Sequence, residues 1–278
     1  MSSFTKSIAI ASVSSFLFVA VASAAYTGAP VADGGTLSGK VSFKGAQPAP
    51  EKFDFAKFPQ PKFCSQTDSD GTAGSGEGHR LRQDVKVNKG GLADAVVYIT
   101  NIEKGKPMKM SITEIQADHC RFLVQGGTSK SVGVIFNDKT AGGVSVTNMD
   151  ADPSDPKTVN GILHNPHGYA MVGPMSTTIF NKPLASKGSN ITEKVKPIWF
   201  KKADVFMKVE CDQHNYMNAW ALPVENPYYA IVNDDGTFSI DQIPAGKYEV
   251  KAFHPKLGFK VAQIEVTAKG KITTNFEF

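Results

Sequence analysis

Apolar and polar side chains alternate along many short segments of this chain, and this pattern sets the class of fold it can adopt. Between Leu37 and Lys44, for example, leucine, glycine, valine and phenylalanine alternate with serine and lysine. A period of two is typical of a β-strand that buries one face, and turn residues such as Gly45 end the segments. No segment shows a helical apolar stripe over three turns. The chain is therefore predicted to be all-β and of the β-sandwich class.

The predicted strands are short and follow one another along most of the chain. A hairpin is expected in which 85–87 pairs with 95–99 across a turn at Gly90 and Gly91. A long loop is expected over residues 46–78, because this stretch is rich in proline, lysine, serine and glycine. The other predicted strands span residues 37–43, 112–115, 121–124, 132–136, 143–148, 196–200, 203–209, 228–232, 237–240, 247–253, 259–266 and 271–276.

The N-terminus carries the pattern of a secretory signal peptide at residues 1–24. Lys6 supplies a positive charge, an apolar run extends from Ser7 to Ala22, and Ala22-Ser23-Ala24 offers a small-x-small cleavage pattern. The run is shorter than the roughly 20 residues that cross a bilayer, and no second run follows it. We therefore expect an exported protein, periplasmic or secreted, with no membrane span after cleavage. An uncleaved N-terminal anchor is the alternative.

Charge and motif content narrow the classes of function. The chain has 30 Lys and Arg against 26 Asp and Glu, a net charge of +4 that is too small and too scattered for nucleic-acid binding. Glycine-rich phosphate loops, Gly-x-Ser-x-Gly and His-Glu-x-x-His do not occur in the sequence, nor do the repeated His-x-His motifs of multicopper oxidases. We therefore expect a protein that is not an enzyme.

The residues with the richest chemistry lie between Cys211 and Met217. Cys211, His214 and Met217 follow one another at intervals of three, directly after the predicted strand 203–209. Thiolate and thioether favour copper, and imidazole suits both of its oxidation states. A site of this kind needs a second imidazole, for which His164 and His167 are the candidates. The alternative is that Cys211 is structural and that His214 and Met217 only pack around it.

Two segments resemble the cupredoxin family. Cys211-x-x-His214-x-x-Met217 has the spacing of the short ligand loop in amicyanin, a blue copper protein of the amicyanin/plastocyanin-like group, and Asn148-x-Asp150 followed by His164 resembles the strand before the first copper histidine of cupredoxins. The resemblance implies an eight-stranded Greek-key β-sandwich over residues 111–224 with one type 1 (blue) copper ion. It implies His164, Cys211 and His214 as ligands, with Met217 as the axial ligand. His167 is the alternative ligand or a neighbour of the ligands.

The C-terminal residues 225–278 resemble a different family. The turns Asp234-Asp235-Gly236 and Pro244-Ala245-Gly246, set between alternating strands, are similar to those of carboxypeptidase-regulatory-like (transthyretin-like) β-sandwich modules. The stretch 33–45 has a similar pattern and is a candidate for the same module. The expected organisation is a signal peptide (1–24), an N-terminal β-rich extension (25–110), a cupredoxin-like copper domain (111–224) and this smaller module (225–278).

The cysteine count allows one disulfide within the chain. Cys64, Cys120 and Cys211 are the three cysteines, so at most two can pair. Export favours a disulfide, and ligation occupies Cys211, which predicts a bond between Cys64 and Cys120.

Together these patterns predict an exported type 1 copper protein that carries one electron at a time to or from a redox protein partner. The C-terminal module would stabilise it or dock it to a protein or carbohydrate. Two other readings stay open. In the first, the chain is a secreted β-sandwich binding module for carbohydrate or protein. In the second, it is a periplasmic Cu(I) chaperone that exchanges no electrons.

Overall fold

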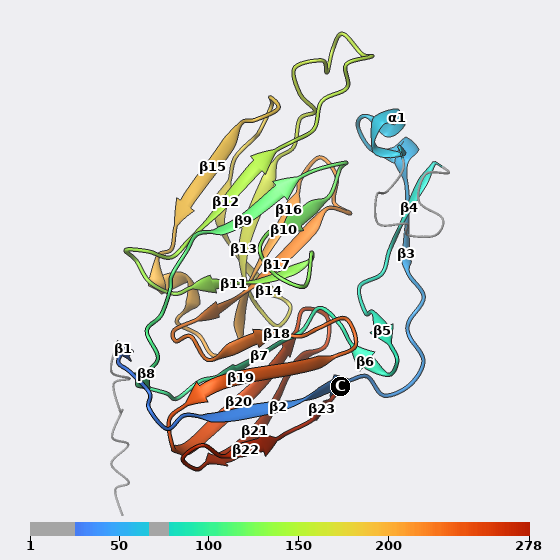
Figure 1. Cartoon of the computed structure of the whole chain (residues 1–278). Helices are drawn as coiled ribbons and strands as arrows, with labels where there is room; N and C mark the ends of the chain where they lie inside the picture. Colours follow the sequence, from blue (N-terminus) through green and yellow to red (C-terminus); the bar gives the residue numbers. More distant parts are fainter. Residues whose placement is uncertain (1–25, 67–77) are drawn as a thin grey trace, which may run out of the picture.

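Two β-sandwiches stacked on each other make up the chain (Figure 1). The computed structural model describes residues 26–66 and 78–278, so the predicted signal peptide at 1–24 lies outside the described residues. The all-β prediction is confirmed, since sheets dominate the described residues and helical segments are short.

The first sandwich comes from the middle of the chain. One sheet has the order β10-β9-β12-β15, and the sheet facing it has the order β11-β17-β16-β13-β14. These are nine strands, where the family resemblance implies eight. Parallel pairing of β9 with β12 and of β11 with β17 shows that the chain crosses between the sheets. The strands span Thr113–Ala117 (β9), Phe122–Val124 (β10), Val132–Phe136 (β11), Gly143–Asn148 (β12), Pro166–Val172 (β13), Met175–Asn181 (β14), Asn190–Lys194 (β15), Val205–Cys211 (β16) and Asn218–Val224 (β17).

The second sandwich is built from both ends of the chain. Its sheets have the orders β18-β7-β20-β21 and β19-β2-β6-β5, and two further strands, β22 and β23, pair with β2. The stretch 33–45, whose place the sequence left open, therefore belongs to this sandwich. The strands span Gly35–Ser42 (β2), Val87–Asn88 (β5), Gly91–Leu92 (β6), Val96–Ile99 (β7), Tyr229–Ile231 (β18), Thr237–Ile243 (β19), Gly246–His254 (β20), Gly258–Val266 (β21), Lys271–Thr273 (β22) and Phe276–Glu277 (β23). A small separate pair joins β1 (Thr27–Gly28) to β8 (Lys104–Gly105).

Alternation along the central strands explains how the two sandwiches pack together. In β16, Met207, Val209 and Cys211 point into the core of the first sandwich, while Phe206 points the other way. Phe206 joins an apolar layer between the sandwiches that also contains Trp220 from β17 and Phe253 from β20. Because successive side chains of a strand face opposite sides, β16 buries one face in the first sandwich, while its other face carries Phe206 together with the partly exposed Lys208 and Glu210.

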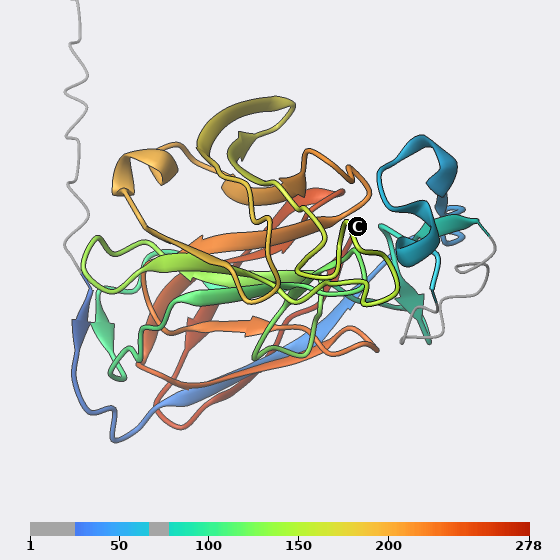
Figure 2. The ribbon, with the colours of Figure 1, turned by 90° about the horizontal axis from the view of Figure 1, so that it is seen from above.

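A capping segment leaves the second sandwich after β2 and covers one end of the first (Figure 2). It consists of β3 (Glu51–Asp54), the 3-10 helix η1 (Phe55–Lys57), the helix α1 (Pro61–Cys64) and the returning strand β4 (His79–Arg82), which pairs with β3. The predicted loop over 46–78 is therefore wrong for residues 51–64, which form regular elements, and its residues 67–77 lie outside the described residues. Phe55 and Cys64 are buried in the core of the first sandwich, which anchors this segment there.

The predicted hairpin of 85–87 with 95–99 is also wrong. Lys89 and Gly90 both have positive φ and form a tight turn that pairs β5 with β6 instead. Asp94, again at positive φ, then redirects the chain, and β7 joins a different sheet between β18 and β20.

A third correction concerns residues 196–200, which form a 3-10 helix, η2 (Pro197–Phe200), in place of the predicted strand. Pro197 has no backbone N–H for a sheet, and it suits the first position of a helix. Within 26–66 and 78–278, no helix has the length and the apolar composition needed to cross a membrane.

Candidate metal centre

A tight loop between β16 and β17 holds three of the predicted ligands. His214 donates its backbone N–H to the carbonyl of Cys211 at 3.1 Å, and Met217 donates its own to the carbonyl of His214 at 2.8 Å. The loop closes where the Cys211 N–H meets the Met217 carbonyl at 3.2 Å. Cys211, His214 and Met217 are each at most 1% exposed. The three-residue spacing thus folds into successive turns at the end of a strand, as the sequence predicted.

His164 reaches the same place from the segment that leads into β13, the strand next to β16 in the same sheet. It forms an isolated antiparallel bridge with Leu184, its N–H donating at 3.1 Å and its carbonyl accepting at 2.7 Å. The next residue, Asn165, donates its backbone N–H to Cys211 Sγ at 3.3 Å. This bond ties the His164 segment directly to the sulfur. Asn165 also lies next to β13, whose first residue, Pro166, pairs with Cys211.

Both imidazoles point the same nitrogen at the sulfur. The distance from Cys211 Sγ to Nδ1 is 3.9 Å for His164 and 3.7 Å for His214. Metal–imidazole bonds of about 2.0 Å and a metal–thiolate bond of about 2.3 Å, meeting at about 120°, place nitrogen and sulfur about 3.7 Å apart. The donor set and its spacing therefore fit a trigonal metal site. Met217, the predicted axial ligand, is buried in the same loop.

Each histidine is held by its other ring nitrogen. His164 Nε2 donates to Asp150 Oδ2 at 2.8 Å, and His214 Nε2 donates to the carbonyl of Pro59 at 3.0 Å. With Nε2 engaged as a donor, Nδ1 is the nitrogen that faces Cys211 and can bind a metal. Partners of this kind fix ring orientation and tautomer in metal sites.

The metal-free ligands also favour a thiolate. Burial alone opposes ionisation of Cys211, but hydrogen bonds from His164 and His214, with their charge, outweigh it and lower the pKa of Cys211 from 9.0 to about 6. Burial likewise opposes protonation of His164, but Asp150 and Cys211 raise the pKa of His164 to about 9. The thiolate is the form of cysteine that binds metals, so Cys211 is ready to ligate near neutral pH. A bound metal would replace the proton that His164 carries on Nδ1.

The insert between Asp150 and His164 closes back on the site. Asn148 Nδ2 donates to the carbonyls of Ile162 at 2.7 Å and Leu184 at 3.0 Å, while its Oδ1 accepts the N–H of Asp150. The two ends of the insert therefore lie side by side. The motif Asn148-x-Asp150 pointed to this strand, but neither residue was predicted to have a role of its own.

His167 does not join the cluster. It lies on β13, where Nδ1 is 3.1 Å from Asp212 Oδ1 and Nε2 is 2.9 Å from Thr178 Oγ1. Its ring stacks on Tyr169 at a centroid distance of 4.0 Å. Of the two candidate histidines, the structure brings only His164 to Cys211 and His214.

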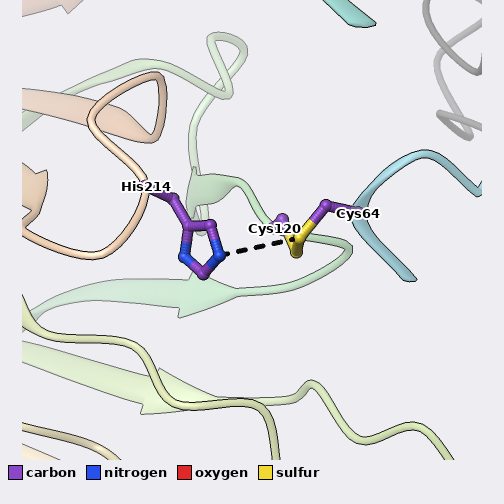
Figure 3. A group of neighbouring side chains, drawn as sticks. All are labelled: Cys64, Cys120 and His214. Atoms are coloured by element: carbon purple, nitrogen blue, oxygen red, sulfur yellow. Dashed lines mark hydrogen bonds between the residues drawn. A yellow bond between two sulfur atoms is a disulfide. The ribbon is translucent and has the colours of Figure 1, made fainter. Parts of the chain in front are cut away.

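The predicted disulfide between Cys64 and Cys120 is confirmed. It joins α1 to the turn between β9 and β10, and it lies against the outer edge of His214 (Figure 3). Cys64 Sγ is 3.8 Å from His214 Nε2. The carbonyl of Pro59, in the same segment, was missed by the sequence analysis because any residue can offer a backbone carbonyl.

Of three comparisons with known proteins, one bears on this fold. The family model for the β-sandwich domain of ER membrane protein complex subunit 7 matches residues 212–276, which supports a β-sandwich in that part of the chain. Among solved structures, the chain is similar to the Cu-containing nitrite reductase of Thermus scotoductus SA-01, with 15% identity over 44% of this chain and 24% of that chain. Its TM-score of 0.26 is too low to carry an argument about the site. No curated protein matches.

Proposed function

We propose that the chain is an exported copper protein that binds one type 1 copper ion and carries one electron at a time to or from a redox protein, without catalysing a reaction of its own. The observation that carries the proposal is the pair of histidine Nδ1 atoms facing Cys211 Sγ at 3.9 and 3.7 Å inside a buried loop. Two imidazoles, one thiolate and a weak thioether are the donors of blue-copper centres.

The ligands would divide the work by their chemistry. Bound copper would take up and give back one electron by changing between Cu(II) and Cu(I). Cys211 would provide the soft thiolate, whose charge the Asn165 N–H partly offsets at 3.3 Å. His164 and His214 would complete a plane whose positions Asp150 and the Pro59 carbonyl hold fixed. Burial of Cys211, of the two histidines and of Asp150 would keep water away from the site.

An oxidising compartment is the setting that the cysteines support. The Cys64–Cys120 disulfide is of a kind that persists in exported proteins, and the signal-peptide pattern at residues 1–24 agrees with it. A periplasmic or secreted location is therefore part of the proposal.

A titration of the metal-free protein with Cu(II) tests the proposal. Wild type is expected to bind one copper and to develop an intense visible absorption from thiolate-to-copper charge transfer. Cys211→Ser should lose that absorption because a hydroxyl oxygen is a harder donor. Tight, colourless binding of Cu(I) alone would point instead to a copper chaperone.

The family-model match favours a second candidate. A β-sandwich domain of a membrane-complex subunit matches residues 212–276, so the second sandwich could serve assembly with another protein. That role needs no metal. If the titration shows no copper binding and Cys211→Ser leaves the chain fully functional in such an assembly, the binding-module role replaces the electron carrier.

A further inference from the structure

The imidazole of His214 lies between the sulfur atom of Cys211 on one edge and the Cys64–Cys120 disulfide on the other. Its Nδ1 is 3.7 Å from Cys211 Sγ, and its Nε2 is 3.8 Å from Cys64 Sγ on the opposite edge of the ring. The sulfur atoms of Cys64 and Cys120 and a ring nitrogen of His214 all lie within 4.8 Å of one another, and all three residues are buried (Figure 3). The type 1 site uses only the Nδ1 edge.

We propose that reduction of the disulfide turns Cys64, Cys120 and His214 Nε2 into a second metal site, specific for Cu(I). A protein dithiol of the exporting compartment would supply two electrons and two protons, becoming a disulfide while Cys64 and Cys120 become thiols. Binding of Cu(I) would then release both thiol protons. The proton on His214 Nε2 would leave the Pro59 carbonyl and move to Nδ1, which faces Cys211 Sγ.

Contacts other than the disulfide hold the two cysteines together. The Arg80 guanidinium donates to the carbonyl of Cys120, to that of His119 at 3.0 Å and to that of Cys64 at 3.4 Å. Asp150 Oδ2 accepts the N–H of Cys120 at 2.9 Å. Breaking the sulfur–sulfur bond therefore leaves the two backbones linked through Arg80. The positive charge of Arg80 also offsets the charge of two thiolates beside a monovalent ion.

The donors select the ion. Two thiolates and one imidazole in a buried place suit soft Cu(I), whereas structural zinc takes four ligands. Because a neutral imidazole has one free nitrogen, His214 can serve the type 1 site or the second site, but not both. The redox state of the disulfide would thus decide which site holds copper. The second site itself does not depend on the proposed electron carrier, whereas the choice between the two sites rests on it.

The experiment uses Cys211→Ser, which removes the thiolate of the first site. The variant is reduced with a phosphine, freed of reductant without oxygen, and titrated with Cu(I) against a chromogenic Cu(I) chelator. Reduced Cys211→Ser is expected to bind one Cu(I) at least about 10-fold more tightly than the oxidised variant, because gaining two thiolate ligands should matter at least as much as the outer-shell partners of ligands, whose loss costs about 10- to 100-fold. X-ray absorption should show two sulfur ligands and one nitrogen ligand.

Two further variants keep the test decisive. The triple variant Cys64→Ser, Cys120→Ser, Cys211→Ser should bind Cu(I) no better than oxidised Cys211→Ser does. If reduced Cys211→Ser binds Cu(I) only as tightly as this triple variant, the proposal is overturned. In reduced Cys211→Ser, adding His214→Gln should abolish the nitrogen ligand and weaken binding by about 10-fold or more. Unchanged affinity would mean that loose thiols bind the ion, and a preference for Zn(II) would also overturn the proposal. The charge-transfer absorption of oxidised wild type reports on the type 1 site separately.

Discussion

Asp150 joins the metal centre to the disulfide through one buried carboxylate. Its Oδ2 accepts a hydrogen bond from His164 Nε2 at 2.8 Å and another from the backbone N–H of Cys120 at 2.9 Å. Its Oδ1 accepts the N–H of His119 at 2.6 Å, where His119 and Cys120 both have positive φ. The turn that carries the disulfide and the histidine that faces Cys211 are therefore positioned by the same side chain.

Asp150→Asn is expected to weaken copper binding by about 10- to 100-fold, the usual effect of removing a partner that orients a metal-binding histidine. An amide has only one acceptor oxygen, so its NH₂ must face at least one of the three donors that Asp150 now satisfies. Competition titration with a copper chelator measures the change. Asp152→Asn is the matched control, because Asp152 lies in the same insert but bonds to Ser154. Equal affinity of the two variants would contradict the role given to Asp150.

His164→Ala should abolish the charge-transfer absorption, since it removes one of the two nitrogen atoms that face Cys211 Sγ. His167→Ala should leave the absorption unchanged, because His167 is occupied with Asp212 and Thr178. The two histidines are three residues apart in the same segment, which makes them a matched pair. Visible spectra of both copper-loaded variants decide the matter. The assignment of His164 is wrong if the effects of the two substitutions are reversed.

The segment 225–278 alone is expected not to fold. It lacks β2, which pairs with β19, β22 and β23, and β7, which pairs with β18 and β20. What is left is the hairpin of β20 with β21, and an isolated hairpin is marginally stable at best in water. Circular dichroism and thermal unfolding of the fragment check this against a chain of residues 25–278. A cooperative transition in the fragment would show that it is an independent module.

In that sandwich, the backbone at Gly91 lies very close to the backbone that leads into the C-terminal strands. A Cβ atom at this position would lie 1.7 Å from the carbonyl oxygen of Asp235, on the turn before β19. Because the contacting atoms are backbone atoms, no side-chain movement could make room for a Cβ at this position. Gly91 thus lets β6 approach the C-terminal strands as closely as it does.

The residues of the candidate metal centre could be grouped from the sequence largely because most of them are local. Cys211, His214 and Met217 lie within one loop, so their spacing alone brings them together, and only His164 had to come from a distance. The disulfide could be predicted because one of three cysteines was assigned elsewhere. The pairing of β2 with C-terminal strands could not be predicted from the sequence, since a period of two shows which face of a strand is buried but not which other strand it packs against or pairs with.

The elements that the sequence analysis missed carry weak local signals. The strand β17 is buried on both faces and reads as a nearly continuous apolar run, so it lacks the alternation that marked other strands. The strand β13 begins with a proline and contains Gly168, both of which usually argue against a strand. Gly168 is required there, because a Cβ would lie 2.3 Å from the ring of Phe180.

His254 should make the stability of the metal-free protein fall in mild acid. It is fully buried at the end of β20; its Nδ1 accepts the N–H of Lys256 at 3.2 Å, and its Nε2 has no hydrogen-bond partner among the described residues. Burial lowers the pKa of His254 from 6.5 to about 4. The charges of Lys256 and Lys86 add to this shift, and those of Asp94 and Asp84 oppose it. Between these values the unfolded chain binds the proton and the folded chain does not. Stability is therefore lost as the pH falls from 6.5 to 4, by about 3 kcal/mol in all.

His254→Gln removes this titration and should flatten the dependence of unfolding free energy on pH over that range, whatever its effect at neutral pH. Chemical denaturation at a series of pH values gives the slope for wild type and variant. His119→Gln is the control, since the His119 side chain is 46% exposed and its substitution should leave the slope of wild type in place. A wild-type slope that persists in His254→Gln would assign the acid sensitivity to other groups. Loss of the slope in His254→Gln alone would place it at this buried, half-satisfied imidazole.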